Sequence, residues 1–474
     1  MSTIASPTAR GALVGIATVV VERAIAFVVV LVLARTLSPE MFGRYGYVLA
    51  GMTLVQVVAD QGIEVAAVAA MSAASGTMPE IFAAALLLRL LVWCLIAVPV
   101  GCLVLPALAS GGDPSGLAMA GLAASGLVLV GGSISMRGVL RAQGAMGAMA
   151  RVALADAVLG AGAVLAVARS GAGLVGIFFA RTVASLAVTG LALALGPHRP
   201  ALALGSLRTL ARLVRVAAPL GGNAVMIGLH TRAGHLVAMA LAGPVVVGLL
   251  GVAARVTEVL GVLPEGALLA LFPRMAADAS QAPALAATAA RRLAALVLGL
   301  VIVLAVGADP IASTLFGDAY AAAGPAIAIL AWIALFAVTG GIALHAIVAC
   351  NAERLLLPAN VVAAIVGVVL QVVLIRAFGL RGAAMATVAT AAIGQLALAV
   401  PTATRAVMVP VWRAVLPLVG VAVAAVSAGR YLQPSLVGAI AAAGVYVILA
   451  GTLGLVGRDD WRVMRAALAR PRIG

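Results

Sequence analysis

Charged side chains inside long apolar runs are the residues of this chain that could do chemistry. An arginine or aspartate at the centre of a bilayer costs about 2.5 to 3.5 kcal/mol on insertion scales, so it needs a partner, water or a function. Arginine could bind phosphate oxygens in pairs, because its planar guanidinium stays charged. The carboxylates could relay protons or bind cations. The candidates are Glu22, Arg23, Asp60, Glu64, Arg89, Arg181, Arg232, Arg255, Glu258 and Glu265.

A structural role is the alternative for each of these side chains. One set could be buried ion pairs that orient helices rather than the lining of a transport cavity: Glu22, Arg23, Asp60 and Glu64. Arg255 and Glu258 are three residues apart on a predicted helix, so they could form a local pair. Arg89 lies near the start of its apolar run, and we expect its guanidinium to snorkel to the membrane interface.

Motifs of soluble enzymes are missing from the sequence or lie in the wrong context. The chain contains no lysine, so it cannot form a Walker A loop. Residues 171–176, GAGLVG, match GxGxxG but open an apolar run without a preceding strand, which favours helix packing over dinucleotide binding. Cys94, Cys102 and Cys350 have no CxxC spacing, so neither a disulfide framework nor a metal site is indicated. We therefore predict no catalytic residue, no metal and no cofactor.

The composition explains where these charges must lie. Hydrophobic residues make up 64% of the 474 residues and charged residues 9%, and the mean hydropathy is +1.22. Such values are typical of polytopic membrane proteins and not of soluble domains. A helix needs about 20 apolar residues to cross about 30 Å of hydrocarbon, and the chain provides about 14 such segments. The predicted fold class is therefore an all-α polytopic membrane protein with about 14 transmembrane helices.

Charges, prolines and glycines mark the ends of the predicted spans. The spans lie near residues 12–34, 45–70, 83–106, 117–136, 152–168, 173–195, 216–240, 245–271, 293–308, 326–349, 356–376, 382–400, 414–429 and 434–456. If both termini are cytoplasmic, 19 arginines fall on inner segments and six on outer ones. The positive-inside rule thus predicts this orientation and accounts for the net charge of +15 without a nucleic-acid partner.

An internal repeat relates the two halves of the chain. At a shift of about 205 positions Pro39, Gly43, Gly46 and Asp60 overlay Pro244, Gly248, Gly251 and Glu265. At a shift of 206, Gly173, Gly176 and Ala180 overlay Gly379, Gly382 and Ala386. Six spans per half make the repeats parallel, related by an axis along the membrane normal. The sequence predicts an N-terminal lobe (1–200), a C-terminal lobe (201–404), and two additional helices with a basic cytoplasmic tail (405–474).

Three segments resemble the polysaccharide flippases of the multidrug/oligosaccharidyl-lipid/polysaccharide exporter superfamily. LVLARTLSPEMFGRYGYVLAG (residues 31–51) resembles the first hairpin of that family. The segment 218–276, which begins APLGGNAVMIG, resembles its seventh and eighth helices, and FGLRGAAMAT (378–387) resembles the start of its twelfth. The resemblance implies two six-helix lobes and alternating access.

The same resemblance implies a substrate, binding residues and a location. The substrate would be a polyprenyl-diphosphate-linked oligosaccharide, flipped across a bacterial cytoplasmic (inner) membrane for lipopolysaccharide or exopolysaccharide synthesis. Arg23, Arg232 and Arg255, and less surely Arg181, would hold the diphosphate in a central cavity. The partners would be membrane lipids and the polymerase and glycosyltransferases of the pathway.

Ion coupling and two rival functions remain open. The candidates for proton or sodium coupling are Glu22, Asp60, Glu64, Glu258 and Glu265. A cation-coupled drug antiporter of the same superfamily would favour an acidic cavity, whereas arginines here match or exceed the carboxylates. A polytopic polymerase or ligase of polysaccharide synthesis would need a large outer loop with catalytic groups, which the connections do not provide.

Overall fold

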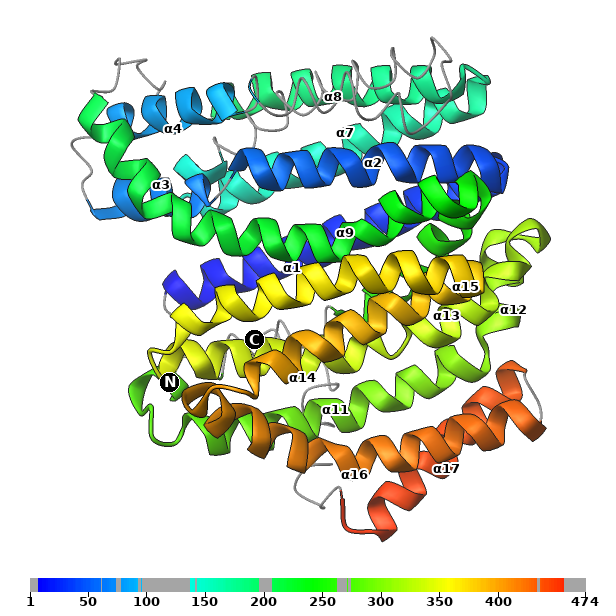
Figure 1. Cartoon of the computed structure of the whole chain (residues 1–474). Helices are drawn as coiled ribbons and strands as arrows, with labels where there is room; N and C mark the ends of the chain where they lie inside the picture. The colour runs from blue at the N-terminus through cyan, green and yellow to red at the C-terminus, as the bar shows by residue number, and fades with distance from the viewer. Residues whose placement is uncertain are drawn as a thin grey trace, which may run out of the picture. The chain divides into compact units, whose positions relative to one another are not determined.

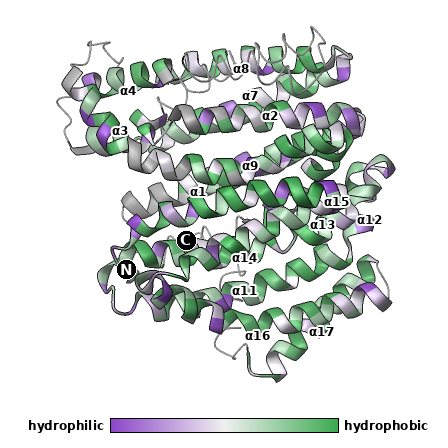
Figure 2. Cartoon of the chain, in the orientation of Figure 1, coloured by the Kyte–Doolittle hydropathy of each residue, from purple (hydrophilic) through white to green (hydrophobic). Residues whose placement is uncertain are grey.

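The described part of the chain is helical and contains no strand (Figure 1). The computed structural model describes residues 7–60, 62–73, 78–92, 95, 137–140, 143–195, 207–261, 271, 274–432 and 435–455. Apolar residues dominate the long helices, as Figure 2 shows. The predicted all-α membrane fold is confirmed.

Eight helices of the described residues are long and apolar enough to cross a membrane. Two of these stretches belong to helices that are too long for one crossing: α9 (Leu207–Glu258) and α15 (Leu356–Leu398). The 43 residues of α15 would extend about 65 Å at 1.5 Å per residue, about twice the hydrocarbon thickness. The backbone leaves the helical conformation at Gly243 (φ 82°) and Gly379 (φ 54°). Each long helix therefore contains two of the predicted spans, joined at a glycine that tolerates positive φ.

The chain divides into two compact units, Met1–Gly248 and Leu249–Gly474. Unit 1 contains α1 (Pro7–Thr36), α2 (Pro39–Asp60), α3 (Ile63–Ala73), α4 (Met78–Val92), α7 (Met146–Ser170), α8 (Gly173–Leu195) and most of α9. Helix α7 packs against both α1 and α8. The predicted span 45–70 is broken at Gly62 (φ 73°), which separates α2 from α3. The predicted span 117–136 lies outside the described residues.

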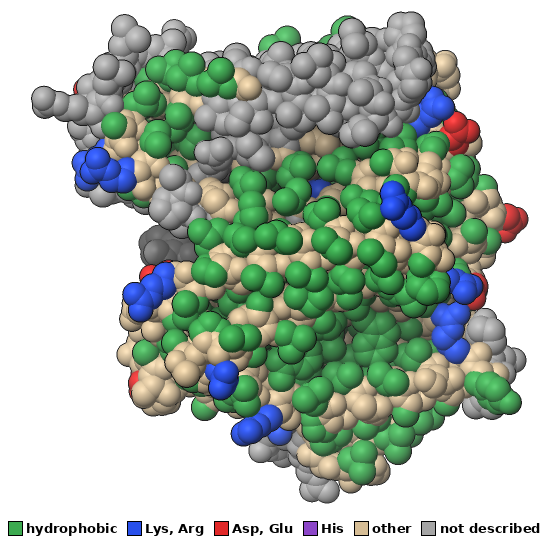
Figure 3. Space-filling model, viewed as in Figure 1, with side chains coloured by type: hydrophobic (Ala, Val, Ile, Leu, Met, Phe, Trp, Pro, Cys, Tyr) green, Lys and Arg blue, Asp and Glu red, His purple; other side chains and the backbone are tan. Residues whose placement is uncertain are grey.

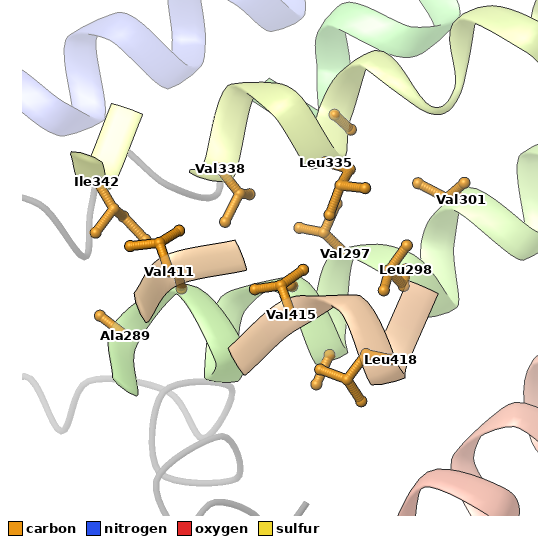
Figure 4. Packing of buried hydrophobic residues seen from close by; sticks show 14 of the residues in the cluster. Ala289, Val297, Leu298, Val301, Leu335, Val338, Ile342, Val411, Val415 and Leu418 are labelled. Atoms are coloured by element: carbon orange, nitrogen blue, oxygen red, sulfur yellow. The ribbon is translucent and has the colours of Figure 1, made fainter. Parts of the chain in front are cut away.

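Unit 2 is built around α11 (Ala282–Val306), which packs against α14 (Ile333–Ala349), α16 (Thr402–Leu432) and α17 (Leu436–Thr452). Figure 4 shows the interleaved apolar side chains of α11, α14 and α16. Val297, Val338 and Val415 are fully buried there. Two short elements fill the connection that we expected before the span 326–349: α12 (Ala308–Phe316) and η5 (Asp318–Ala323). The predicted span itself comprises α13 (Gly324–Leu330) and α14. The remaining short turns of unit 2 are η4 (Val259–Gly261) and η6 (Glu353–Leu355).

Apolar side chains also cover the outside of the helices (Figure 3). On α15 the side chains of Ile365, Val369 and Val373 are 63%, 56% and 55% exposed. Their spacing of four residues places them on one stripe of the helix. An exposed apolar stripe of this length on a chain of this composition is suited to contact lipid.

The repeat predicted from sequence reappears in the backbone. Gly173 and Gly379, which overlay at a shift of 206 positions, both have positive φ, at 66° and 54°. Pro39 is the first residue of α2, and Pro244 follows the kink of α9. Related residues thus occupy related turns. The lobe boundaries inferred from the repeat remain predictions.

A buried polar network joins α16 to the helices before it. The Gln395 Oε1 atom on α15 accepts hydrogen bonds from Thr339 Oγ1 on α14 (3.0 Å) and from Trp412 Nε1 on α16 (3.1 Å). The Gln395 Nε2 atom donates to the Phe336 carbonyl on α14 (2.8 Å). One amide side chain therefore holds three helices in register within unit 2.

Two further side chains fasten the last helices to α11. The Tyr446 hydroxyl on α17 donates to the Ala295 carbonyl (3.2 Å) in a buried setting. The Arg430 guanidinium, in the last turn of α16, donates to the Ala305 carbonyl (2.9 Å) near the end of α11, where a cation favours the helix dipole. These two helices, which lie outside the sequence repeat, are thus integral to unit 2.

Candidate functional site

Three ion pairs connect different helical segments among the described residues of unit 1. Glu22 pairs with Arg137 (3.2 Å), Glu64 with Arg89 (3.9 Å) and Asp156 with Arg181 (2.9 Å). All three join residues from different helical segments. Each pair brings a carboxylate of one apolar helix against an arginine of another, which offsets the cost of either charge at membrane depth.

The Glu22–Arg137 pair connects α1 with the short helical segment 137–140. The Arg137 Nη1 atom donates to Glu22 Oε1, and the two side chains are 21% and 30% exposed respectively. Arg137 is a residue that the sequence reasoning missed, because it was counted only among the arginines of the inner connections. Its position directly after a predicted span was the one available signal.

The Glu64–Arg89 pair connects α3 with α4. The Arg89 side chain is 10% exposed and its guanidinium faces Glu64, so the expectation that it snorkels to the interface is wrong. The physical reason is that Arg89 is buried beside the Glu64 carboxylate, which stabilises its charge in place of interfacial water. A Cβ atom at Gly138 would lie 3.6 Å from Glu64 Cγ. Arg137 therefore pairs with Glu22, and its neighbour Gly138 lies beside the Glu64 side chain.

The Asp156–Arg181 pair connects α7 with α8 through two hydrogen bonds. The Arg181 Nη1 and Nη2 atoms donate to Asp156 Oδ1 (2.9 Å) and Oδ2 (3.2 Å), the paired geometry that guanidinium and carboxylate favour. Gly160 on α7 leaves room for the guanidinium, because an added Cβ would lie 3.0 Å from Arg181 Cζ and nearer still to Nη1. Arg181 therefore has a carboxylate partner at the position where the sequence suggested a diphosphate ligand.

Arg255 and Glu258 form the local pair that the sequence left open. The Arg255 Nη1 atom donates to Glu258 Oε2 at 2.7 Å, three residues along α9. Both residues belong to unit 2. Their side chains are 28% and 47% exposed, so solvent screens the attraction between them.

The remaining candidates differ in how much the structure says of them. Arg23 is exposed on α1, and Arg232 is half-buried on α9. Asp60 is the last residue of α2, and its side chain is not described. Glu265 lies outside the described residues. Among the described residues no group of three or more His, Cys, Asp or Glu side chains could hold a metal ion.

The described charges of unit 1 are mostly paired across helices. Glu22, Glu64 and Asp156 each face an arginine, which neutralises them. Arg23 and Arg232 add two further guanidinium groups to unit 1.

Comparison with known proteins identifies related sequences and folds. Residues 8–277 match the polysaccharide biosynthesis protein family. Among solved structures, an inward closed conformation of the lipid II flippase MurJ is similar with a TM-score of 0.74 and 12% identity, over 93% of this chain and 98% of that one. An inward-facing multidrug resistance MATE family transporter of the MOP superfamily is similar with a TM-score of 0.61 and 16% identity, over 86% and 95%. No curated protein sequence matches. At these identities the two structures show a shared fold.

Proposed function

The chain belongs to the polysaccharide biosynthesis protein family, and on that premise we propose that it flips a polyprenyl-diphosphate-linked oligosaccharide across the cytoplasmic membrane by alternating access. The likeness in fold to a lipid II flippase supports a lipid-linked substrate. The eight apolar helices of the described residues fit a multi-pass membrane protein. The product would serve the export of a polysaccharide.

The chemistry of the substrate explains why a membrane protein would be needed. A sugar diphosphate cannot leave water for hydrocarbon without losing the hydration of its charges, which costs far more than thermal energy supplies. The polyprenyl tail can stay in the bilayer throughout. The carrier must therefore shield only the headgroup and supply cations for its phosphate oxygens.

The single observation that carries the structural argument is the exposed Arg23 in the middle of α1. It lies 16 residues after Pro7, about 24 Å along the helix at 1.5 Å per residue. Exposed valines flank it, such as Val21 (43%) and Val28 (50%). An exposed guanidinium in the middle of an apolar helix can meet the phosphate oxygens of a ligand, and hydrocarbon alone would not stabilise its charge.

We assign the diphosphate to four arginines in descending order of support. Arg23 comes first because it is exposed on α1, and Arg232, half-buried on α9, comes second. Arg255 and Arg181 hold carboxylates at 2.7 and 2.9 Å, so each would have to exchange Glu258 or Asp156 for phosphate. That exchange costs a formed ion pair and makes these two the weaker ligands.

Ion coupling is proposed through the acidic residues of the same helices. Glu22, Glu64 and Glu258 would each have to part from an arginine to take up a proton or sodium ion. The proposal also includes Asp60 and Glu265. Coupling would be contradicted if transport into vesicles kept its rate without either ion gradient and also after replacement of these carboxylates. The flippase proposal would remain intact.

The pairing of carboxylates with arginines disfavours the cation antiporter. A drug cation needs carboxylates whose charge is available, and the Glu22, Glu64 and Asp156 side chains already face guanidinium groups. The fold comparisons in turn favour a transporter over a polymerase or ligase. We also propose that a polymerase and glycosyltransferases of the same pathway are partners of this chain. That partnership does not require the chain to catalyse a reaction.

The test is the topology of the lipid-linked oligosaccharide in cells that lack this protein. We expect the oligosaccharide to accumulate in the inner leaflet, inaccessible to a glycosidase added outside. Arg23→Ala and Arg232→Ala should reproduce the accumulation, whereas Arg169→Ala, an exposed arginine at the end of α7, should not. Normal outward exposure of the oligosaccharide in the absence of the protein would refute the proposed function.

A further inference from the structure

Two prolines interrupt the backbone hydrogen bonds of α16, one of the last two helices of unit 2. Pro410 and Pro417 both lie inside the helix, beyond its first turn. A proline has no backbone N–H, so it cannot donate to the carbonyl four residues earlier, and its ring pushes against that carbonyl. The carbonyls of Ala406 and Arg413 therefore lose their usual helical donors. At membrane depth such a carbonyl needs a replacement donor.

Both carbonyls lie on the exposed side of α16. The opposite side packs on α11 and α14, where Val415 is fully buried (Figure 4). The exposed side includes a stripe of residues four, three and four positions apart, which is the spacing of neighbours on one face of a helix. The members are Ala406, Pro410, Arg413 and Pro417, of which Pro410 is half-buried and the others are exposed. A helical carbonyl points toward the residue four positions later, so both carbonyls lie along this stripe.

The indole of Trp412 fixes the rotation of α16 about its own axis. Its N–H donates to Gln395 Oε1 (3.1 Å), and its ring packs on Phe336 with the ring centroids 5.7 Å apart. Arg413 is about 100° further round the helix, and its side chain is exposed. No residue of the described part of the chain forms an ion pair with its guanidinium. Arg413 therefore presents its guanidinium on the same side of α16 as the open carbonyls.

Arg413 lies at the depth of lipid headgroups. Arg430 follows it by 17 residues, about 26 Å along α16 at 1.5 Å per residue. That length is close to the roughly 30 Å of hydrocarbon that a span crosses, so the two arginines mark the two ends of the apolar segment. In the orientation that the arginines of the chain predict, Arg413 is at the cytoplasmic end. Ala406 lies about 10 Å nearer the cytoplasm, where water can donate to its carbonyl.

The two groups of Arg413 require different partners. Its guanidinium binds phosphate oxygens, and its carbonyl accepts an N–H donor. The headgroup of phosphatidylethanolamine contains both a phosphate and a primary ammonium, which is a donor like that of lysine. Phosphatidylcholine has the same charges but no N–H, and phosphatidylglycerol has a phosphate without an ammonium. Of these three lipids, phosphatidylethanolamine alone matches both groups.

We propose that Arg413 and Pro417 form a binding site for phosphatidylethanolamine on α16. The lipid phosphate pairs with the Arg413 guanidinium. The lipid ammonium donates to the Arg413 carbonyl, which Pro417 leaves without a helical donor. The site lies on the lipid-facing side of unit 2, and its ligand is a membrane phospholipid and not the transported oligosaccharide. The inference does not depend on the proposed function.

The first experiment compares phospholipids that differ only in their N–H donors. The purified full chain, stripped of lipid in detergent, is titrated with phosphatidylethanolamine, its N-methyl and N,N-dimethyl forms, and phosphatidylcholine, and native mass spectrometry measures the bound lipid. We expect phosphatidylethanolamine to bind at least about tenfold more tightly than phosphatidylcholine, with the methylated forms between them. Equal affinities across the series would overturn the site. So would phosphatidylglycerol binding as tightly as phosphatidylethanolamine.

Variants separate the two contacts of the lipid. Pro417→Ala restores a backbone N–H for the Arg413 carbonyl, so the preference for phosphatidylethanolamine over phosphatidylcholine should disappear. Arg413→Gln should weaken the binding of both lipids. Pro410→Ala is the matched control, because the carbonyl that it satisfies lies nearer the cytoplasm, and it should keep the preference. Alanine is a better helix former than proline, so neither proline variant threatens the fold. A preference that survives Pro417→Ala would overturn the site.

The second experiment tests the site in a bilayer. Leu416 and Val423 are 56% and 47% exposed on the same helix. Each is replaced by cysteine in a chain whose native cysteines are changed to serine, labelled with a thiol-reactive diazirine, and illuminated in vesicles of equal phosphatidylethanolamine and phosphatidylcholine. Capture at position 416 should be enriched in phosphatidylethanolamine, whereas capture at position 423, deeper in the bilayer, should follow the vesicle composition. Equal capture of the two lipids at position 416 would overturn the site, and neither experiment requires transport.

Discussion

Replacement of Gly160 by alanine tests whether the Asp156–Arg181 ion pair stabilises unit 1. Gly160 on α7 faces the guanidinium of Arg181, and an added Cβ would lie 3.0 Å from Cζ and nearer to Nη1. The arginine can move, but it then loses the geometry in which two of its nitrogens reach both oxygens of Asp156. The substitution therefore removes the ion pair without changing either charge.

The expected magnitude combines two opposing effects. Hydrogen bonds to charged groups contribute about 1.5 to 3 kcal/mol, and because the Arg181 side chain is 31% exposed we reduce the value of the pair to about 1 to 2 kcal/mol. Alanine in a helix interior gains about 0.5 to 1 kcal/mol over glycine. Gly160→Ala should thus lose up to about 1.5 kcal/mol, and Gly162→Ala should gain about 0.5 to 1 kcal/mol.

The assay is the free energy of unfolding of both variants in the same detergent. Gly162 lies on the same helix, and a Cβ there would meet no described atom within 4 Å, so it isolates the backbone effect of alanine. The two variants should differ by the value of the pair, about 1 to 2 kcal/mol. In an Asp156→Ala background the difference should vanish, because the pair is already absent.

Two results would refute this reasoning. Gly160→Ala could stabilise the protein as much as Gly162→Ala does, which would mean that the guanidinium adjusts without loss. Alternatively, the cost of Gly160→Ala could persist in the Asp156→Ala background. That persistence would place the cost in packing and not in the ion pair.

Three further substitutions follow from buried polar groups. Gln395→Ala should destabilise unit 2 by about 3 kcal/mol, because it creates a cavity and leaves the Trp412 indole N–H without its acceptor; thermal unfolding in detergent measures this, and an unchanged midpoint would contradict it. Tyr47→Phe should leave stability unchanged or raise it by up to about 1 kcal/mol, since it removes a buried hydroxyl that no described residue satisfies; a clear loss in the same assay would reveal a partner. Tyr446→Phe should cost about 0.5 to 1.5 kcal/mol, the value of one neutral hydrogen bond, and a cost above that of Gln395→Ala would contradict this ranking.

The turns of the fold could be predicted from local sequence signals. Pro39 begins α2 as a proline at the start of a span suggests, and Gly243 and Gly379 mark the breaks within α9 and α15. Gly62, which separates α2 from α3, was not distinguished from the many other glycines of the chain. A glycine signals a break only where its neighbours require positive φ, and that requirement depends on packing.

For the charged residues, the sequence identified several positions but not the partners. Their placement inside apolar runs identified Glu22, Glu64 and Arg181 as unusual, because a charge far from the ends of such a run is costly in hydrocarbon and is visible in the sequence. Their partners were not identified. Arg137 lies 115 residues from Glu22, and no local pattern connects the two. Arg89 was expected at the interface because its distance from the end of the run was visible, whereas the carboxylate facing it was not.

By itself, the sequence determined that this protein is a helical membrane protein with two related halves, because hydropathy, proline, glycine and their repetition are properties of neighbouring residues. Only the tertiary structure decided which arginine meets which carboxylate and which glycines contact each other. Gly43 and Gly46 look alike in the sequence, yet one supports a backbone against Pro244 and the other has open space around it. Contacts of that kind depend on where separate helices cross, and a crossing point is set by the packing of all the side chains between them.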